Sequence, residues 1–184
     1  MCARFRVWFG MSRALYVGRF QPFHLGHLYA VRYVAERSSE FIVMIGSAQY
    51  SHTLDDPFSA GERVTMIRLS LDEAGIDPSR YYIIPVTDLN LHEVWVAHVV
   101  SYVPKFDVVY TNEPLTRRLF LEDKRFPVKP VPLRKRKSYS ATEVRKRILN
   151  GENWKELLPK SVAKFIEEIN GVERLRDLNK DDKA

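Results

Sequence analysis

A short apolar run, a glycine-bounded loop and a helical pattern follow one another near the start of the chain, and they constrain its fold most. The run, Ala14 to Val17, is too short for a helix and ends at Gly18, so it predicts a buried parallel strand. After the loop, apolar residues recur at helical spacing from Leu28 to Ala35. In open α/β folds, ligands bind where a strand leads into a helix N-terminus, because free N–H groups and the helix dipole attract anions.

The loop carries side chains suited to a phosphate. His24 and His27 are three residues apart, so at a helix start they share one face and can both donate to phosphate oxygens. Arg19 adds a planar cationic fork. Gly18 favours a sharp turn, and Gly26 allows a base or a phosphate to come close. The loop therefore predicts a site for a phosphate-bearing ligand.

The two histidines also have less specific explanations. They could be unrelated surface residues, or they could bind a metal ion together. A zinc site needs further ligands, and residues 18–27 contain no cysteine, aspartate or glutamate. The fixed places of Arg19, Pro22 and two glycines after a strand favour phosphate binding over unrelated surface residues.

Further apolar runs and helical patterns alternate along the chain. Strands are expected over residues 14–17, 41–46, 81–86, 108–110 and 128–133, the last flanked by prolines as an edge strand would be. Helices are expected after residue 27, over 59–75, 95–102 and 140–150, from 111–114 onward, and over 154–169 as one or two covering helices. The alternation predicts an α/β fold, a doubly wound parallel five-stranded sheet with C-terminal helices.

Two helix starts carry a serine followed three residues later by a glutamate, which predicts capping boxes. The pairs are Ser59 with Glu62, and Ser140 with Glu143. The helix from residue 59 has a regular apolar face and is expected to be structural. On the helix from residue 140, Thr142 and Arg145 share a face, and Arg145 leans back toward an anion held at the helix start.

Length and composition limit the remaining classes. The chain has 184 residues, 45% hydrophobic and 28% charged, as expected for one globular domain. We expect an extension over 1–12, one domain over 13–175 and a charged tail over 176–184. No apolar run approaches a membrane span, and two arginines interrupt the N-terminal apolar segment, so no signal peptide is expected. A single cysteine suits a reducing compartment, and we expect the cytoplasm.

The net charge of +6 lies in one segment. Residues 134–147 contain seven basic residues and one acidic residue, and the rest of the chain has 22 of each. A charge focused on one loop and helix start suits a polyphosphate, whereas a duplex needs a broad basic stripe. A nucleic-acid-binding protein that uses Arg134 to Lys137 as a basic patch remains a distant alternative.

The pattern Gly-x-Phe-x-Pro-x-His-x-Gly-His, from Gly18 to His27, resembles the signature of the nucleotidyltransferase superfamily related to class I aminoacyl-tRNA synthetases. Together with the segments 47–49 (Ser-Ala-Gln), 51–53 (Ser-His-Thr) and 140–145 (Ser-Ala-Thr-Glu-Val-Arg), it resembles the archaeal-type nicotinamide mononucleotide (NMN) adenylyltransferase family. The likeness covers residues 13–175, which it identifies as a nucleotidyltransferase domain.

This resemblance implies a sheet of order 3-2-1-4-5 and the synthesis of NAD and pyrophosphate from ATP and NMN. It implies Mg²⁺ carried mainly by the ATP phosphates, no metal ligands from the protein, and a homohexamer. The implied catalytic residues are Arg19, His24, His27 and Arg145. The implied ATP-binding set is Gly18, Arg19, Phe20, His24, Gly26, His27, Arg136, Ser140, Thr142 and Arg145. The implied NMN-binding set is Ser47, Gln49, Asp88, His92 and Trp95.

Some positions depart from the family pattern or keep two explanations. His92 stands where asparagine is commoner, Glu113 where a small or amide residue is usual, and Ala141 where glycine is common. Trp95 is either a core residue or the aromatic partner on which a cationic nicotinamide stacks. The alternative acceptors are nicotinate mononucleotide and phosphopantetheine, and a CTP-type reaction is also open.

Overall fold

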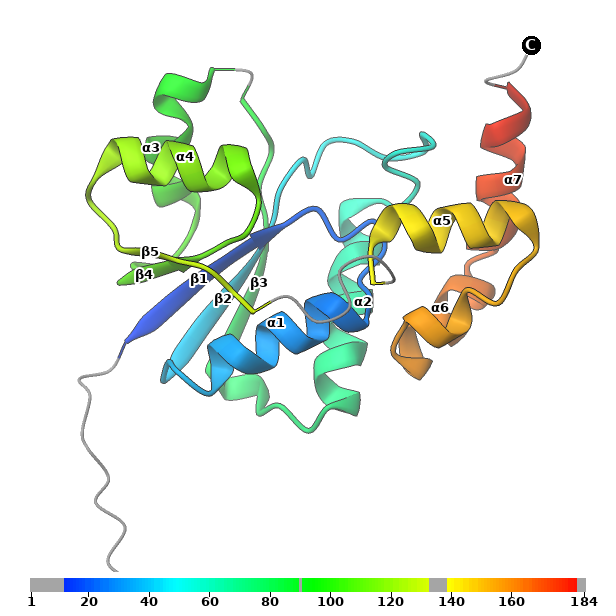
Figure 1. Cartoon of the computed structure of the whole chain (residues 1–184), viewed down its shortest axis with the longest axis horizontal. Helices are drawn as coiled ribbons and strands as arrows, with labels where there is room; N and C mark the ends of the chain where they lie inside the picture. The colour runs from blue at the N-terminus through cyan, green and yellow to red at the C-terminus, as the bar shows by residue number, and fades with distance from the viewer. Residues whose placement is uncertain (1–11, 90, 133–138, 182–184) are drawn as a thin grey trace, which may run out of the picture.

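The computed structural model describes residues 12–89, 91–132 and 139–181, and a parallel sheet runs through its centre (Figure 1). The strands are β1 (Arg13–Gly18), β2 (Glu40–Ile45), β3 (Tyr81–Pro85), β4 (Val108–Tyr110) and β5 (Val128–Lys129). Their order is β3-β2-β1-β4-β5, and every neighbouring pair is parallel. The predicted fold class and strand order are confirmed.

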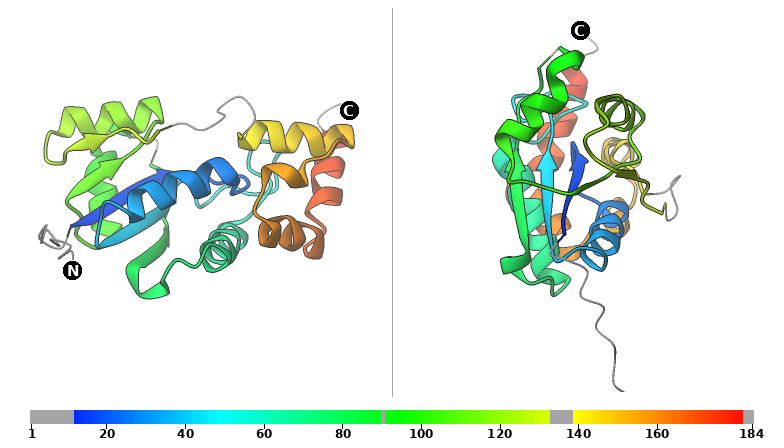
Figure 2. Two further views of the ribbon diagram at one scale, coloured as in Figure 1. Left: turned by 60° about the horizontal axis from the view of Figure 1, so that its bottom comes forward. Right: turned by 90° about the vertical axis from the view of Figure 1, so that its left-hand side faces the viewer.

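Seven α-helices connect and extend this sheet within the described residues. They are α1 (Leu25–Ala35), α2 (Ala60–Glu73), α3 (His92–Tyr102), α4 (Pro114–Asp123), α5 (Ala141–Asn150), α6 (Lys160–Glu168) and α7 (Gly171–Asp181), with short 3₁₀ turns at Pro78–Arg80 and Lys155–Leu157. Figure 2 shows α5, α6 and α7 grouped together at one end of the molecule. The expected charged tail of residues 176–184 starts inside α7. None of the helices in the described ranges is long and apolar enough to cross a membrane.

The core has two parts, one on each face of the sheet, because successive side chains of a strand point to opposite faces. Tyr16 of β1 belongs to the part that includes α1 and α2, whereas Leu15 belongs to the part covered by α3 and α4. Trp95, Val99 and Tyr102 recur at helical spacing, which is typical of core residues. Trp95 and Val99 are buried, but Tyr102 is 54% exposed, whereas Val103 and Phe106 beyond the helix belong to the core.

Strand β5 is shorter than the sequence predicts. It contains only Val128 and Lys129, although the apolar pattern extends to residue 133. Asn112 accounts for the early end, because its amide donates to the Val131 carbonyl at 2.6 Å and its oxygen accepts from the Val131 N–H at 3.1 Å. The Asn112 side chain thus takes the place of the next backbone hydrogen bonds between β4 and β5.

The two predicted capping boxes turn out differently. Ser59 and Glu62 form a complete box at the start of α2. At α5, Ser140 accepts the Glu143 N–H at 3.1 Å, but the Glu143 carboxylate bonds Arg147 at 3.0 Å instead of reaching back. The second box is therefore only half formed, since a cation one turn along the helix binds the glutamate.

Glu62 also connects α2 to α7. Its two carboxylate oxygens each accept a bond of 2.8 Å from Arg174, which also donates to the Pro57 carbonyl. Burial alone would raise the pKa of Glu62, but the bonds from Arg174 and from the Ser59 N–H outweigh it and lower that pKa. A carboxylate with a lowered folded pKa stabilises a protein above its unfolded pKa and loses that effect in acid.

We therefore predict that Glu62→Gln lowers the free energy of unfolding by about 1–2 kcal/mol at pH 7. The difference from the unaltered protein should shrink as the pH falls from about 5 to about 3. Urea unfolding across this range measures it. Glu122→Gln, which removes an exposed pair with Arg118, is the control and should cost about 0–0.5 kcal/mol. An equal loss at pH 7 and pH 3 would contradict the prediction.

Candidate active site

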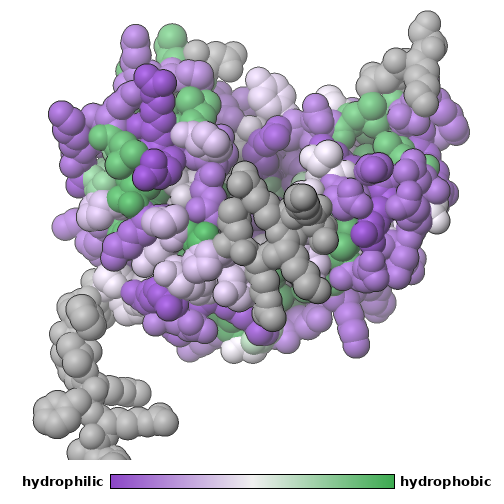
Figure 3. Space-filling model, in the orientation of Figure 1, coloured by the Kyte–Doolittle hydropathy of each residue, from purple (hydrophilic) through white to green (hydrophobic). Residues whose placement is uncertain are grey.

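A cavity of about 690 Å³ lies at the carboxyl ends of the central strands. Its lining comes from the segments that follow all five strands and from α1, α3, α4 and α5. The register explains the convergence, because Gly18 pairs with Ile45 and Ile45 with Pro85, so three strands end at one edge. In Figure 3 the surface is hollowed between the α3–α4 side and the α5–α7 side.

Most of the predicted site residues line this one cavity. From the predicted ATP set these are Gly18, Arg19, Phe20, His24, Gly26, His27, Ser140, Thr142 and Arg145, and from the predicted NMN set Ser47, Asp88, His92 and Trp95. Gln49 does not line it but bonds a residue that does. Arg136 lies outside the described residues. The two predicted half-sites therefore share a single space.

His24 and His27 cap the start of α1 with each other's backbone. The Nδ1 of His24 accepts the His27 N–H, and the Nδ1 of His27 accepts the His24 N–H, both at 3.3 Å. The rings stack with their centroids 3.6 Å apart. His24 is therefore the N-cap residue rather than part of the first turn, and the arrangement is a capping box built from imidazoles.

This cap determines what the two rings can offer a ligand. Burial lowers the pKa of His24 to about 3, and burial together with the adjacent His24 ring holds the pKa of His27 well below 6.5. A neutral imidazole has one N–H, and since each Nδ1 accepts a bond, that N–H is on Nε2. Both rings thus act as neutral Nε2–H donors, and both line the cavity.

The two glycines of the loop are approached by side chains of the chain itself. A Cβ on Gly18 would lie 2.7 Å from the Phe20 ring, and Phe20 adopts a φ of 57°. A Cβ on Gly26 would lie 3.0 Å from the His24 ring and 3.1 Å from the Cβ of Tyr139. A side chain at residue 18 would displace the Phe20 ring, and one at residue 26 would press on His24 and Tyr139, so close packing favours glycine at both positions.

Arg145 reaches from α5 to the loop after β1. Its Nη1 donates to the Gln21 carbonyl at 2.9 Å, and its Nη2 bonds Asp55 Oδ1 at 3.1 Å. The Arg145 side chain is 12% exposed, whereas that of Asp55 is 83% exposed. These two bonds hold the guanidinium in place while it lines the cavity, and the predicted contact with an anion at the helix start stays a prediction.

Arg19 and Asp56 form a looser ion pair at the same edge of the cavity. An Arg19 Nη1 lies 3.6 Å from Asp56 Oδ1, and the Arg19 side chain is 62% exposed. That oxygen of Asp56 is buried and has no hydrogen-bond donor within the described part of the chain. Arg19 therefore keeps its hydrogen-bonding capacity toward the cavity that it lines.

Asp88 joins the other half of the cavity. Its carboxylate accepts from the Ser47 hydroxyl at 2.5 Å and from the Trp95 indole N–H at 3.2 Å. Its backbone makes two bonds with the Gln49 amide, at 2.9 and 3.1 Å. Four of the five predicted NMN-binding residues are thus one connected cluster, and the fifth, His92, lines the cavity at the start of α3.

Trp95 packs in the core and also borders the cavity, so its position is compatible with both roles that the sequence left open. It is 7% exposed and packs edge-to-face on Phe120 at a centroid distance of 5.8 Å. It also lines the cavity. The helical spacing therefore identifies a core residue, and the same ring borders the space where a ligand would lie. His52 behaves differently, since it is exposed, bonds Ser51 and does not line the cavity.

Comparison with known proteins decides the family. Residues 15–147 match the family described as cytidylyltransferase-like. A nicotinamide-nucleotide adenylyltransferase of Methanolobus tindarius is 50% identical over 173 residues, which cover 94% of this chain and 98% of the relative. Another, of Saccharolobus solfataricus, is 49% identical over 173 residues, which cover 94% and 100%. The chain belongs to the nicotinamide-nucleotide adenylyltransferase family. The resemblance based on the loop motif is confirmed.

Solved structures of adenylyltransferases share the fold. A bifunctional NMN adenylyltransferase/ADP ribose pyrophosphatase from Francisella tularensis, crystallised with AMP and a manganese ion, has a TM-score of 0.75 and 26% identity. The match covers 92% of this chain and 52% of that one, so this chain spans about half of the bifunctional protein. A putative nicotinate-nucleotide adenylyltransferase from Vibrio parahaemolyticus, 13% identical with a TM-score of 0.61, shares the fold alone.

One departure from the pattern of the adenylyltransferase family has a local explanation. Glu113 is the N-cap of α4, and its carboxylate accepts the N–H groups of Leu115 at 3.1 Å and Thr116 at 2.5 Å. Both carboxylate oxygens are therefore bonded to the helix, although the residue borders the cavity. The acidic side chain satisfies a helix start here.

The structure from Francisella tularensis contains a manganese ion besides AMP. In this member of the adenylyltransferase family, no three histidine, cysteine, aspartate or glutamate side chains among the described residues are grouped so as to hold a metal ion. The cationic and imidazole side chains that line the cavity, Arg19, His24, His27, His92 and Arg145, offer N–H donors that suit phosphate oxygens.

Two residues that bond the loops and side chains around the cavity were missed by the sequence reasoning. Arg63 of α2 is fully buried and donates to carbonyls of the loops after β1 and β2. Asp55 binds Arg145 from 90 positions away. An arginine on the buried face of a predicted amphipathic helix was the available signal for Arg63. No local pattern signals the Asp55 contact, because it depends on the folded loop.

The neutral histidine pair leads to a pH prediction. The unfolded chain protonates both rings below about pH 6.5, while the folded chain keeps them neutral to a lower pH, so the unfolded state binds more protons. Stability should therefore fall as the pH drops from about 6.5 toward about 4, by up to about 1.4 kcal/mol per pH unit for each ring.

Urea unfolding of His24→Asn tests this. Asparagine keeps an oxygen for the His27 N–H but removes one titrating ring, so the stability curve should be shallower below about pH 6.5. NMR of the imidazoles gives a second measurement, in which neither ring should titrate between about pH 8 and pH 5. Normal titration of both rings near pH 6.5 would refute the assignment of two neutral donors.

Proposed function

We propose that this protein is an NMN adenylyltransferase, which transfers AMP from ATP to the phosphate of NMN and releases NAD and pyrophosphate. One observation carries the proposal beyond family membership. A single cavity contains both the neutral histidine pair with Arg145 and the cluster around Asp88 and Trp95. The first group suits a polyphosphate and the second a planar ring, so two substrates can meet there.

The reaction needs no general base in this proposal. An oxygen of the NMN phosphate is ionised near pH 7 and attacks the α-phosphorus of ATP in line. A new O–P bond forms, the bond from the α-phosphorus to the bridging oxygen breaks, and pyrophosphate leaves with the electron pair. No covalent intermediate on the protein forms. Catalysis then depends on holding the two phosphates in line and on stabilising the developing charge.

The histidine pair and the arginines supply that stabilisation. His24 and His27 direct Nε2–H donors into the cavity, and a donor that is already neutral needs no proton rearrangement when phosphate binds. Arg145 is held by the Gln21 carbonyl and can exchange the exposed Asp55 for pyrophosphate oxygens. Arg19 orients the phosphates, and the start of α5, with Ser140 and Thr142, offers N–H groups to the leaving group. Arg136 keeps its predicted part in neutralising pyrophosphate.

The acceptor half holds the nicotinamide. Trp95 offers an indole face to a cationic pyridinium ring, and its own N–H is directed away, toward Asp88. Both Ser47 and Gln49 bond Asp88, Ser47 at its carboxylate and Gln49 at its backbone carbonyl. His92 stands at the start of α3 to contact the carboxamide. The Trp95 ring, held by the bond from its indole N–H to Asp88, favours a flat cationic acceptor over a flexible pantetheine chain.

Mg²⁺ enters this proposal as part of the substrate, carried by the ATP phosphates. A magnesium ion prefers octahedral oxygen coordination and keeps several waters, so triphosphate oxygens and water can coordinate it without protein ligands. The proposal keeps the homohexamer that the family resemblance implies and the cytoplasm that the single cysteine suggests. Sedimentation of the purified protein at several concentrations measures the first.

Acceptor comparison tests the function. Pyrophosphate release from ATP should be fast with NMN and far slower with phosphopantetheine, because NMN offers a cationic ring to Trp95 and phosphopantetheine does not. Nicotinate mononucleotide carries the same ring and is the closer competitor. The assay is a coupled measurement of pyrophosphate with each acceptor at the same concentration. Turnover with phosphopantetheine but not with either pyridine nucleotide would replace the proposed function with the alternative.

Trp95→Leu should raise the KM for NMN by about tenfold and leave the KM for ATP within about twofold, because it removes the stacking face and not the phosphate donors. Val99→Ala is the matched control, since Val99 is buried one turn further along α3 and does not line the cavity. It should lower stability and change neither KM. If both KM values rise together in Trp95→Leu, the residue serves the core alone.

Arg145→Ala should lower kcat/KM for ATP by about 10²–10³-fold, because a charged donor to the departing pyrophosphate is lost. Arg147→Ala is its control on the same helix, where Arg147 bonds Glu143 and Glu156 outside the cavity. That variant should turn over normally.

Duplex DNA should bind the unaltered protein weakly and lose affinity steeply with salt. Intact turnover of Arg145→Ala with tight, sequence-dependent DNA binding would favour the nucleic-acid alternative.

A further inference from the structure

Arg63 is a fully buried cation at the centre of the loops that frame the cavity. It lies in the first turn of α2, the helix that the sequence marks as structural. Within the described residues its side chain makes six hydrogen bonds, all to backbone carbonyls. The accepting residues are Arg19 (3.1 Å), Gly46 (3.0 Å), Ser47 (3.1 Å), Ala48 (3.4 Å), Tyr50 (3.4 Å) and Ser59 (3.3 Å).

The carbonyls that Arg63 holds belong to both halves of the cavity. Arg19 is in the loop after β1, which carries the histidine pair. Ser47 is in the loop after β2, where its hydroxyl bonds Asp88, and its backbone has a φ of 50°. One guanidinium therefore fixes the phosphate side and the acceptor side relative to each other.

The chemistry of arginine suits this task. A guanidinium presents five N–H donors in a rigid plane, so it can bind carbonyls that converge from several directions. A buried loop carbonyl without a donor costs free energy, and these loops end their strands where the β-ladder can no longer satisfy them. A lysine keeps the charge but has three donors on a flexible stem, and it cannot reproduce the fork.

We propose that Arg63 is a positioning residue for the reaction, which sets the distance between the two substrates by fixing the loops after β1 and β2. This rests on the proposed function. Arg63 does not touch the substrates, since it does not line the cavity. It acts through Arg19 and Ser47, so its loss should lower kcat/KM for both ATP and NMN. The effects expected for Trp95 and Arg145, in contrast, each concern one substrate.

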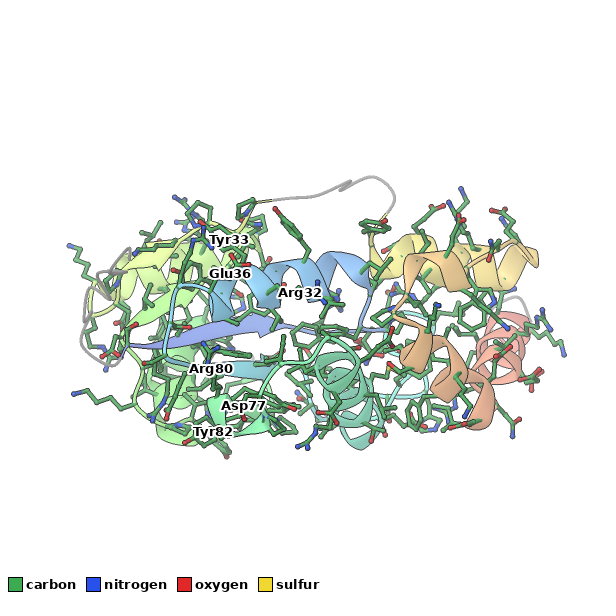
Figure 4. The ribbon with its side chains drawn as sticks, turned by 90° about the horizontal axis from the view of Figure 1, so that it is seen from below. Arg32, Tyr33, Glu36, Asp77, Arg80 and Tyr82 are labelled. Atoms are coloured by element: carbon green, nitrogen blue, oxygen red, sulfur yellow. The ribbon has the colours of Figure 1, made fainter. Side chains whose placement is uncertain are left out.

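Arg80 provides a matched control for a purely structural arginine. It also donates to several carbonyls, those of Ala35 (2.6 Å), Ser38 (2.8 Å) and Ser39 (3.0 Å). It precedes β3 at the amino ends of the strands, opposite to the cavity. Figure 4 shows Arg80 beside Asp77 and Tyr82, at the end of the molecule away from α5.

The experiment compares the unaltered protein with Arg63→Lys and Arg80→Lys. Urea unfolding of each gives its stability, and kinetics are measured at a temperature where all three are folded by their own unfolding curves. Pyrophosphate release gives kcat and both KM values, and quenching of tryptophan fluorescence gives NMN binding without ATP. The proposal expects Arg63→Lys to lose about tenfold or more in kcat/KM for ATP and for NMN, and to bind NMN more weakly. Arg80→Lys should lose stability and keep its kinetics.

Equal kinetics in Arg63→Lys and the unaltered protein would overturn the proposal and leave Arg63 with a structural role. Loss confined to one substrate would also overturn it, since a residue that fixes both loops must affect both. If the unaltered protein releases no pyrophosphate with NMN, the proposed function fails and this inference fails with it. If Arg63→Lys has no cooperative unfolding transition, Arg63→Gln, which keeps two amide N–H donors, is measured in its place against the same outcomes.

Discussion

The parallel register of the three strands β3, β2 and β1 is the constraint on which the site depends. Because Gly18, Ile45 and Pro85 lie on one line across the sheet, the loops that follow them begin at the same edge. Loops from distant parts of the chain then share a small volume, and their polar groups must satisfy one another. Gln21 illustrates this, since its amide pairs with the backbone of Phe58 in both directions at 2.9 Å.

In the proposed function, the atoms that satisfy these loops also prepare the chemistry. In His24 and His27 the Nδ1 atoms cap a helix, which leaves the Nε2–H groups for the cavity that both rings line. In Asp88 one carboxylate keeps a tryptophan in the core and fixes a serine at the cavity. Stability and function are therefore not carried by separate residues here. A site held by backbone and side-chain bonds of this kind is organised before a ligand arrives.

The sequence predicts the parts of this structure that have a local signature. Buried strands appear as apolar runs, and strands one to four are found close to their expected bounds. The strand at the far edge is shorter than its pattern, because a side-chain amide from residue 112 takes over the ladder, and no local pattern encodes such a replacement. The half-formed box at Ser140 fails for a similar reason, since Glu143 had two possible partners and the arginine on the next turn is preferred.

For the site, local motifs identify which residues belong to the cavity but not how they are joined. The histidines, Arg145 and Trp95 lie where their motifs place them. Their partners come from afar, as with Asp88 and Ser47, which are 41 positions apart. Arg63 was hidden because an arginine inside an amphipathic pattern looks like an ordinary helix residue until its carbonyl partners are known.

Trp95 raises a different issue, because its ring is shared between the cavity and Phe120. Truncating such a buried aromatic costs about 3–5 kcal/mol, a large part of the stability of a domain this size. Under the proposed stacking of the acceptor on Trp95, acceptor preference at this position is tied to core packing. A lineage that drifts toward a ligand without a flat ring would then first have to acquire compensating bulk around Phe120, and the order of those two changes would limit the evolutionary routes open to the enzyme.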